Sequence, residues 1–227
     1  MARADTESTL RNHPHVLAHH GFIMIAPEES GRQAGFNGGS CCGKAAATRV
    51  DDLGFFAAVV DEVAVAHPEA AREHVYGVGW SNGGFVVAAD GGQPLQHRLF
   101  SAIALIAGYQ EHPFAPLPGQ TRGGAPPTPI PPPPPLPHPL PVLIHHSKDD
   151  PLVRFGGCCA EQHCCCKIGA AQQKCHGGVM EAVRQYAAAN GCTGGAGALR
   201  DVLPVGCTTL PHCAENVTLC VHDGDGK

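Results

Sequence analysis

The 227-residue chain carries 15 Lys and Arg residues against 20 Asp and Glu residues, a net charge of −5 at pH 7. The basic residues are scattered along the chain, which excludes the clustered positive footprint typical of nucleic-acid binding. Hydrophobic residues make up 43% of the sequence, enough for one core, but no apolar run approaches the roughly 18 residues of a membrane-spanning helix.

Apolar periodicity predicts strands and helices that alternate along the chain. We expect helices over residues 5–20, 51–67, 85–90 and 179–190, and strands over residues 21–27, 74–79, 101–107, 141–145 and 217–221. Asp51 and Asp52 suit a helix N-terminus, and Gly191 suits the position that follows a helix end. Alternation at this spacing is typical of crossover connections, so the sequence predicts an α/β fold with a mostly parallel sheet.

Two segments of biased composition interrupt this pattern. Residues 116–141 are rich in proline, and the unbroken run at 131–135 favours a solvated polyproline II loop between two strands. Residues 158–175 are rich in cysteine. Because neither segment carries a helix or strand pattern, we interpret residues 1–227 as one domain with a Pro-rich and a Cys-rich insert.

Both inserts suggest binding roles that compete with an enzymatic one. The proline run at 131–135 is a candidate ligand for proline-recognition domains of the SH3 or WW type. The Cys-rich insert offers soft metal ligands, but its adjacent cysteines lack the C-x₂-C spacing of a structural zinc site. We therefore expect no metal site there.

Residues 79–83, Gly-Trp-Ser-Asn-Gly, match the G-x-S-x-G pattern of serine hydrolases. The pattern alone occurs often by chance in a chain with 29 glycines. Here it follows an expected strand and opens an expected helix, which is the context that lifts a serine hydroxyl off a sheet at a tight turn. Ser81 is therefore the candidate nucleophile.

A serine hydrolase also needs a carboxylate after a later strand. The strand expected at 141–145 is followed by Asp149 and Asp150, and both qualify by position. The order of serine and then aspartate along the chain is the one that α/β-hydrolases use.

Four sequence blocks, in this order, resemble the polyhydroxybutyrate depolymerase and feruloyl esterase family of α/β-hydrolases. They are residues 38–43 (GGSCCG), 50–55 (VDDLGF), 79–84 (GWSNGG) and 146–157 (HSKDDPLVRFGG). The resemblance runs from about Gly21 to the end of the chain, apart from the two inserts. It implies an α/β-hydrolase-like fold and a secreted serine esterase that acts on feruloyl or polyhydroxyalkanoate esters without a cofactor.

The resemblance also implies roles for single residues. Asp150, followed three residues later by Val153, takes the place of the catalytic acid, and the backbone amide of Asn82 takes that of an oxyanion donor. Cys192 and Cys207 align with a cysteine pair of the family, so the resemblance implies a Cys192–Cys207 disulfide.

The chain departs from the family pattern at both ends. Lys227 stands where the family has its general-base histidine, and His222, five residues earlier, is a poor substitute. The family strand that supplies a second oxyanion amide would precede residue 21, and no signal-peptide pattern opens the chain. The resemblance thus implies a partial hydrolase domain with little turnover. The alternative is an impaired relative that binds partners through its inserts.

Overall fold

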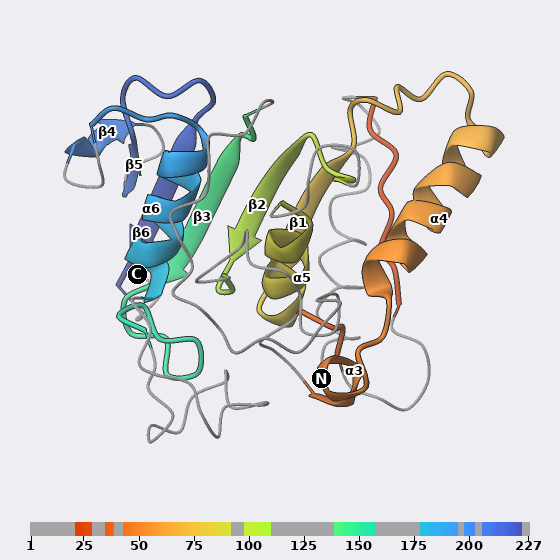
Figure 1. The fold of residues 1–227 in the computed structure, drawn as a ribbon, viewed down its shortest axis with the longest axis horizontal. Helices are drawn as coiled ribbons and strands as arrows, with labels where there is room; N and C mark the ends of the chain where they lie inside the picture. Colours follow the sequence, from red (N-terminus) through yellow and green to blue (C-terminus); the bar gives the residue numbers. More distant parts are fainter. Residues whose placement is uncertain are drawn as a thin grey trace, which may run out of the picture.

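The computed structural model describes residues 21–28, 35–38, 43–91, 98–109, 139–157, 178–194, 198–202 and 206–223 (Figure 1). The elements are α3 (Gly43–Thr48), α4 (Asp52–Ala66), β1 (Tyr76–Trp80), α5 (Asn82–Gly91), β2 (Ala102–Ile106), β3 (Val142–Ser147), α6 (Gly178–Ala189), β4 (Arg200–Val202), β5 (Cys207–Thr209) and β6 (Val217–His222). None of the described helices is long and apolar enough to cross a membrane.

The strands form one mixed sheet in the order β1-β2-β3-β6-β5-β4. Strands β1, β2, β3 and β6 pair in parallel, whereas β6, β5 and β4 pair antiparallel. Helix α5 connects β1 to β2, and α6 lies between β3 and β6 in the chain. The α/β class and the parallel part of the sheet are therefore as the sequence predicts.

The helices and strands with strong apolar periodicity are confirmed to within a few residues. Helix α4 begins after Asp51, whose carboxylate accepts a hydrogen bond from the Gly54 amide, as expected of an N-cap. Helix α6 ends before Gly191, which has φ +65°, the left-handed conformation that terminates helices. Helix α5 begins three residues earlier than expected, directly after Ser81.

Two expectations fail or fall outside the described residues, and one hairpin is present that the sequence does not predict. The strand expected at residues 21–27 is wrong, because residues 21–28 pair with no described strand and Phe22, Ile23, Met24 and Ile25 are exposed. The antiparallel hairpin of β4 and β5 was not expected, since three-residue strands are too short for periodicity to reveal. The helix expected at 5–20 lies outside the described residues.

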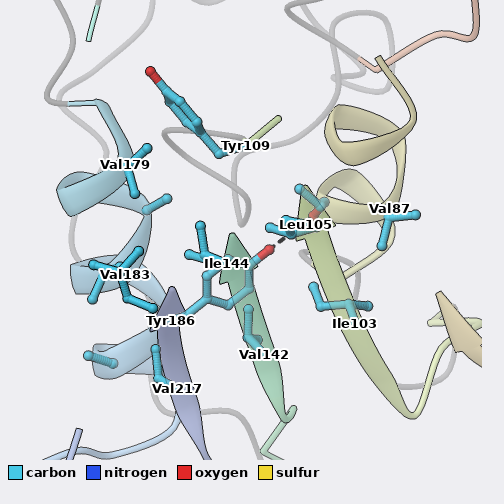
Figure 2. Packing of buried hydrophobic residues seen from close by; sticks show 14 of the residues in the cluster. Val87, Ile103, Leu105, Tyr109, Val142, Ile144, Val179, Val183, Tyr186 and Val217 are labelled. Carbon is cyan, nitrogen blue, oxygen red and sulfur yellow. Dashed lines mark hydrogen bonds between the residues drawn. The ribbon is translucent and has the colours of Figure 1, made fainter. Parts of the chain in front are cut away.

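The hydrophobic core lies between the sheet and two helices. Helix α5 packs on β1 and β2, helix α6 packs on β3 and β6, and both lie on the same side of the sheet (Figure 1). Figure 2 shows their side chains meeting those of the strands, with Leu105, Ile144 and Tyr186 fully buried. On the opposite side of β1, Val78 and Trp80 are exposed.

The disulfide pairing differs from the pairing that the family resemblance implies. Cys192 is bonded to Cys213, and Cys207 is bonded to Cys220. Cys207 and Cys220 lie opposite each other in the β5–β6 ladder, so the strand register brings their sulfur atoms together. The predicted Cys192–Cys207 bond is therefore wrong, although both residues are disulfide-bonded.

Candidate active site

Ser81 forms the whole connection between β1 and α5. Its φ is +51°, a left-handed value that a residue with a Cβ rarely adopts. The Ser81 amide donates to the Ile106 carbonyl (2.8 Å), and the Ser81 carbonyl accepts from the amides of Gly84 (2.9 Å) and Phe85 (3.3 Å). The turn is thus tied to β2 on one side and to the first turn of α5 on the other.

The glycines around this turn permit backbone contacts that a side chain would block. A Cβ atom at Gly79 would lie 2.2 Å from the Gly83 carbonyl oxygen, so β1 and α5 approach closely. A Cβ atom at Gly108 would lie 2.2 Å from the Ser81 carbonyl oxygen. The two glycines of the sequence motif, Gly79 and Gly83, therefore meet each other across the turn.

The side chain of Asn82, the residue after the serine, holds a distant loop against the turn. Its Oδ1 accepts from the Phe36 amide (2.6 Å), and its Nδ2 donates to the Phe36 carbonyl (2.9 Å). The next residue of the loop, Asn37, donates its amide to the Asp52 carboxylate (2.5 Å) and its side-chain amide to the Val50 carbonyl (2.8 Å). Phe36 is therefore held against Asn82, the residue after Ser81, and Asn37 against the start of helix α4.

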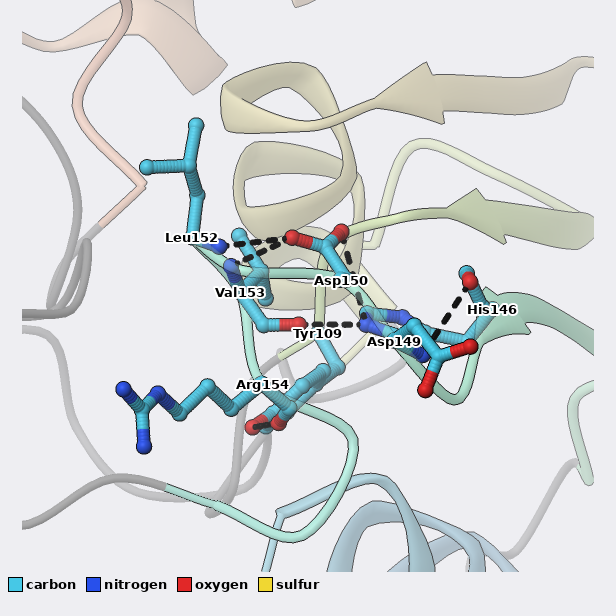
Figure 3. Close-up of polar contacts among 8 residues, drawn as sticks. Tyr109, His146, Asp149, Asp150, Leu152, Val153 and Arg154 are labelled. Atoms are coloured by element: carbon cyan, nitrogen blue, oxygen red, sulfur yellow. Dashed lines mark hydrogen bonds and ion pairs between the residues drawn. The ribbon is translucent and has the colours of Figure 1, made fainter. Parts of the chain in front are cut away.

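The second candidate, Asp150, lies in a tight loop after β3 (Figure 3). Its Oδ1 accepts from the amides of Leu152 and Val153, both at 2.9 Å, which fixes the carboxylate to its own loop. The Asp150 side chain is 16% exposed, whereas Asp149 is exposed to solvent. Of the two carboxylates that qualified by position, Asp150 is the one whose orientation the loop determines.

Ser81 and Asp150 lie at the same edge of the sheet. They follow parallel strands β1 and β3, with only β2 between them. Two strand spacings amount to about 10 Å, a distance that one imidazole ring spans when both side chains lean toward it. The structure therefore places the two predicted residues on one edge of the sheet, without a direct contact between them.

Three described histidines lie at this edge of the sheet. His145 and His222 stack with ring centroids 4.9 Å apart, and burial together with the neighbouring His222 lowers the pKa of His145. His146 is completely buried, which lowers its pKa despite the hydrogen bond of its ring to the Val153 carbonyl and the nearby Asp150. In the described part of the chain, none of them is hydrogen-bonded to the Ser81 hydroxyl.

Within the described ranges, no group of three or more His, Cys, Asp or Glu side chains is arranged to hold a metal ion. The Cys-rich insert and most of the Pro-rich insert lie outside those ranges. No protein-family model, curated protein or solved structure matches this chain.

Three features of this site went unnoticed in the sequence. The sequence assigns no role to the Asn82 side chain, as distinct from its backbone amide, and none to Tyr109. It favours surface or loop imidazoles for the paired histidines at 145 and 146, which is wrong for the buried His146. No local pattern marks the role of Tyr109, because its hydroxyl donates to the carbonyl of Arg154, 45 positions later in the chain. The two adjacent histidines at 145 and 146 are the feature of the sequence that could have drawn attention to His146.

Proposed function

We propose that the chain is a serine hydrolase of carboxylic esters, with an α/β-hydrolase-like fold and Ser81 as its nucleophile. The observation that carries the proposal is the left-handed backbone of Ser81 at a one-residue turn from β1 into α5. A positive φ at a non-glycine residue costs free energy and occurs preferentially at functional sites. Here it presents the hydroxyl at the carboxyl edge of a parallel sheet, where open α/β sheets bind their ligands.

The proposed reaction begins when the Ser81 Oγ attacks the ester carbonyl carbon and its proton passes to a histidine. The carbonyl oxygen becomes an oxyanion. The backbone amide of Asn82, which directly follows Ser81 at the N-terminus of α5, donates a hydrogen bond to this oxyanion in the proposed mechanism. The partial positive charge of that helix end also favours the developing negative charge. The alcohol leaves with the proton, and water then hydrolyses the acyl-Ser81 ester.

Asp150 is the proposed acid that orients the histidine. Its Oδ1 is engaged by two loop amides, while its Oδ2 accepts no hydrogen bond from the described residues. A carboxylate held in this way keeps one oxygen for the imidazole N–H of a general base. The substrate class, feruloyl or polyhydroxyalkanoate esters, rests on the family resemblance of the four sequence blocks.

The test is hydrolysis of short p-nitrophenyl esters by the wild-type chain, Ser81→Ala and Ser101→Ala. Ser101 precedes β2 at the opposite edge of the sheet, where its hydroxyl donates to the Glu73 carbonyl, so it is a matched control. We expect slow turnover that Ser81→Ala abolishes and Ser101→Ala retains. Turnover that survives Ser81→Ala would refute the assignment.

A further inference from the structure

His146 is a buried, titratable side chain that the proposed reaction does not use. It lies near the end of β3 on the face covered by the helices, with a side-chain exposure of 0%. Its ring contacts Tyr109 (centroids 5.6 Å apart) and Phe155 (6.1 Å), both nearly edge-on. The ring is therefore shielded from solvent and cannot exchange protons with a substrate.

The hydrogen bonds of His146 identify its tautomer. Its Nε2 lies 2.6 Å from the Val153 carbonyl oxygen, which can only accept, so Nε2 carries the proton. Its Nδ1 is buried and has no hydrogen-bond partner among the described residues. A second proton on Nδ1 would have no acceptor there, so the ring stays neutral.

A direct pairing of His146 with the candidate acid does not explain its position. The distance from Nε2 to the Asp150 Oδ2 is 3.8 Å, beyond hydrogen-bonding range. The nearer partner of Nε2 is the carbonyl of Val153, whose own amide donates to the Asp150 Oδ1. His146 thus acts on the carboxylate through the backbone of Val153.

Tyr109 holds the neighbouring residue of the same loop. Its hydroxyl donates to the Arg154 carbonyl (2.8 Å), and its ring packs on Phe85 of α5 (6.1 Å) as well as on His146. Gly108, directly before Tyr109, touches the Ser81 turn. Figure 3 shows Tyr109 and His146 beside the loop, with their bonds to two successive carbonyls.

We propose that His146 and Tyr109 are positioning residues that fix the loop of Asp150 by holding the carbonyls of Val153 and Arg154. Their importance for catalysis rests on the function proposed above, whereas their effect on the loop does not. With both carbonyls held, the amides of Leu152 and Val153 stay directed at the Asp150 Oδ1. The carboxylate then keeps one orientation relative to the Ser81 turn.

The test compares substitutions that keep or remove the Nε2 donor. His146→Gln places an amide N–H near the position of Nε2, and His146→Met has a similar length without a donor. His145→Gln is the matched control, since His145 neighbours His146 on the opposite face of β3. Tyr109→Phe removes only the hydroxyl that donates to Arg154.

The main readout is amide hydrogen exchange at Leu152 and Val153, measured by NMR on the full chain. We expect His146→Met and Tyr109→Phe to accelerate exchange there about tenfold, the effect of one lost hydrogen bond. His146→Gln and His145→Gln should stay within about threefold of the wild type. Equal acceleration by Gln and Met at position 146 would overturn the proposal, because the ring would then act through packing alone.

Two further measurements keep the outcome decisive. Imidazole ¹⁵N shifts of the wild-type chain should report a protonated Nε2 and an unprotonated Nδ1, so a protonated Nδ1 overturns the proposal even if His146→Met fails to fold. In ester hydrolysis, Tyr109→Phe should lower kcat with KM unchanged. If exchange responds as expected but no Ser81-dependent hydrolysis exists, the loop inference stands and the proposed function fails.

Discussion

The contact between Gly108 and the Ser81 turn predicts a specific response to an added methyl group. In Gly108→Ala the new Cβ would lie 2.2 Å from the Ser81 carbonyl oxygen and 3.2 Å from the Gly84 Cα. The first distance is about 1 Å inside the closest approach that real Cβ atoms make, and the obstructing atom is backbone. To relieve it, the end of β2 must separate from the turn.

Such a separation would lengthen the hydrogen bond from the Ser81 amide to the Ile106 carbonyl, which joins the same two segments. Overpacking a well-packed site costs about 1–3 kcal/mol. Because neither backbone can move freely, we expect Gly108→Ala to lower the free energy of unfolding by about 3 kcal/mol, the upper end of that range.

Gly83→Ala is the matched control, because a Cβ at Gly83 meets nothing within 4 Å and Gly83 lies within helix α5. Alanine is favoured over glycine in helices by about 1 kcal/mol, so this variant should be as stable as the wild type or more stable. Urea unfolding followed by circular dichroism measures both variants. If Gly108→Ala and Gly83→Ala change the stability equally, the close packing around the Ser81 turn is wrong.

Three further predictions concern other parts of the chain. Asn82→Leu removes both side-chain hydrogen bonds to Phe36 and should lower the free energy of unfolding, measured in urea, by about 1–3 kcal/mol. An unchanged stability would contradict the role of these hydrogen bonds in holding the loop against the turn. Burial raises the pKa of Asp90 from 3.8 to about 6 although backbone amides donate to it, so the fold favours its protonated form. Asp90 therefore adds up to about 3 kcal/mol to the free energy of unfolding below pH 4, and this contribution is lost as the pH rises to 6. Asp90→Asn should remove this decrease of the free energy of unfolding between pH 4 and pH 6. If urea unfolding of Asp90→Asn shows the same pH dependence as the wild type, the prediction is refuted. Replacing Cys192 and Cys213 with serine opens a loop with a sequence separation of 21 and should lower the free energy of unfolding by about 3 kcal/mol. Peptide mapping of the wild-type chain that shows another partner for either cysteine would refute the pairing.

Much of the fold could be predicted because its elements carry their own periodicity. Helix α4 shows apolar residues at helical spacing after a capping aspartate, and strand β2, which buries Ile103 and Leu105, is a continuous apolar run. Their alternation predicts parallel pairing, since parallel strands need crossover helices.

The failures arise where the outcome depends on distant partners. The apolar run at 21–27 reads as a strand, but a strand forms only where another strand accepts its hydrogen bonds, and no described strand does so. The disulfides follow the register of β5 on β6, which places Cys207 opposite Cys220. The spacing of the cysteines in the sequence does not predict the register of these two strands.

The candidate site divides in the same way. Local patterns mark Ser81, at a Gly-rich turn after one strand, and the pair Asp149 and Asp150 after another strand, but only the family resemblance selects Asp150 from that pair. The roles of Tyr109 and of the Asn82 side chain could not be predicted, because their partners, Arg154 and Phe36, come from distant segments of the chain. The role of His146 could not be predicted either, because nothing in the local sequence shows that its ring is buried and meets the Val153 carbonyl.

The most direct test of the proposed function is mass spectrometry of the intact chain after brief exposure to p-nitrophenyl acetate. An acyl-enzyme mechanism predicts one acetyl group on the wild-type chain, located at Ser81 by peptide mapping, and none on Ser81→Ala. Ser101→Ala should be acetylated like the wild type. An unmodified wild-type chain, or an adduct that persists in Ser81→Ala, would contradict the assignment of Ser81 as the nucleophile.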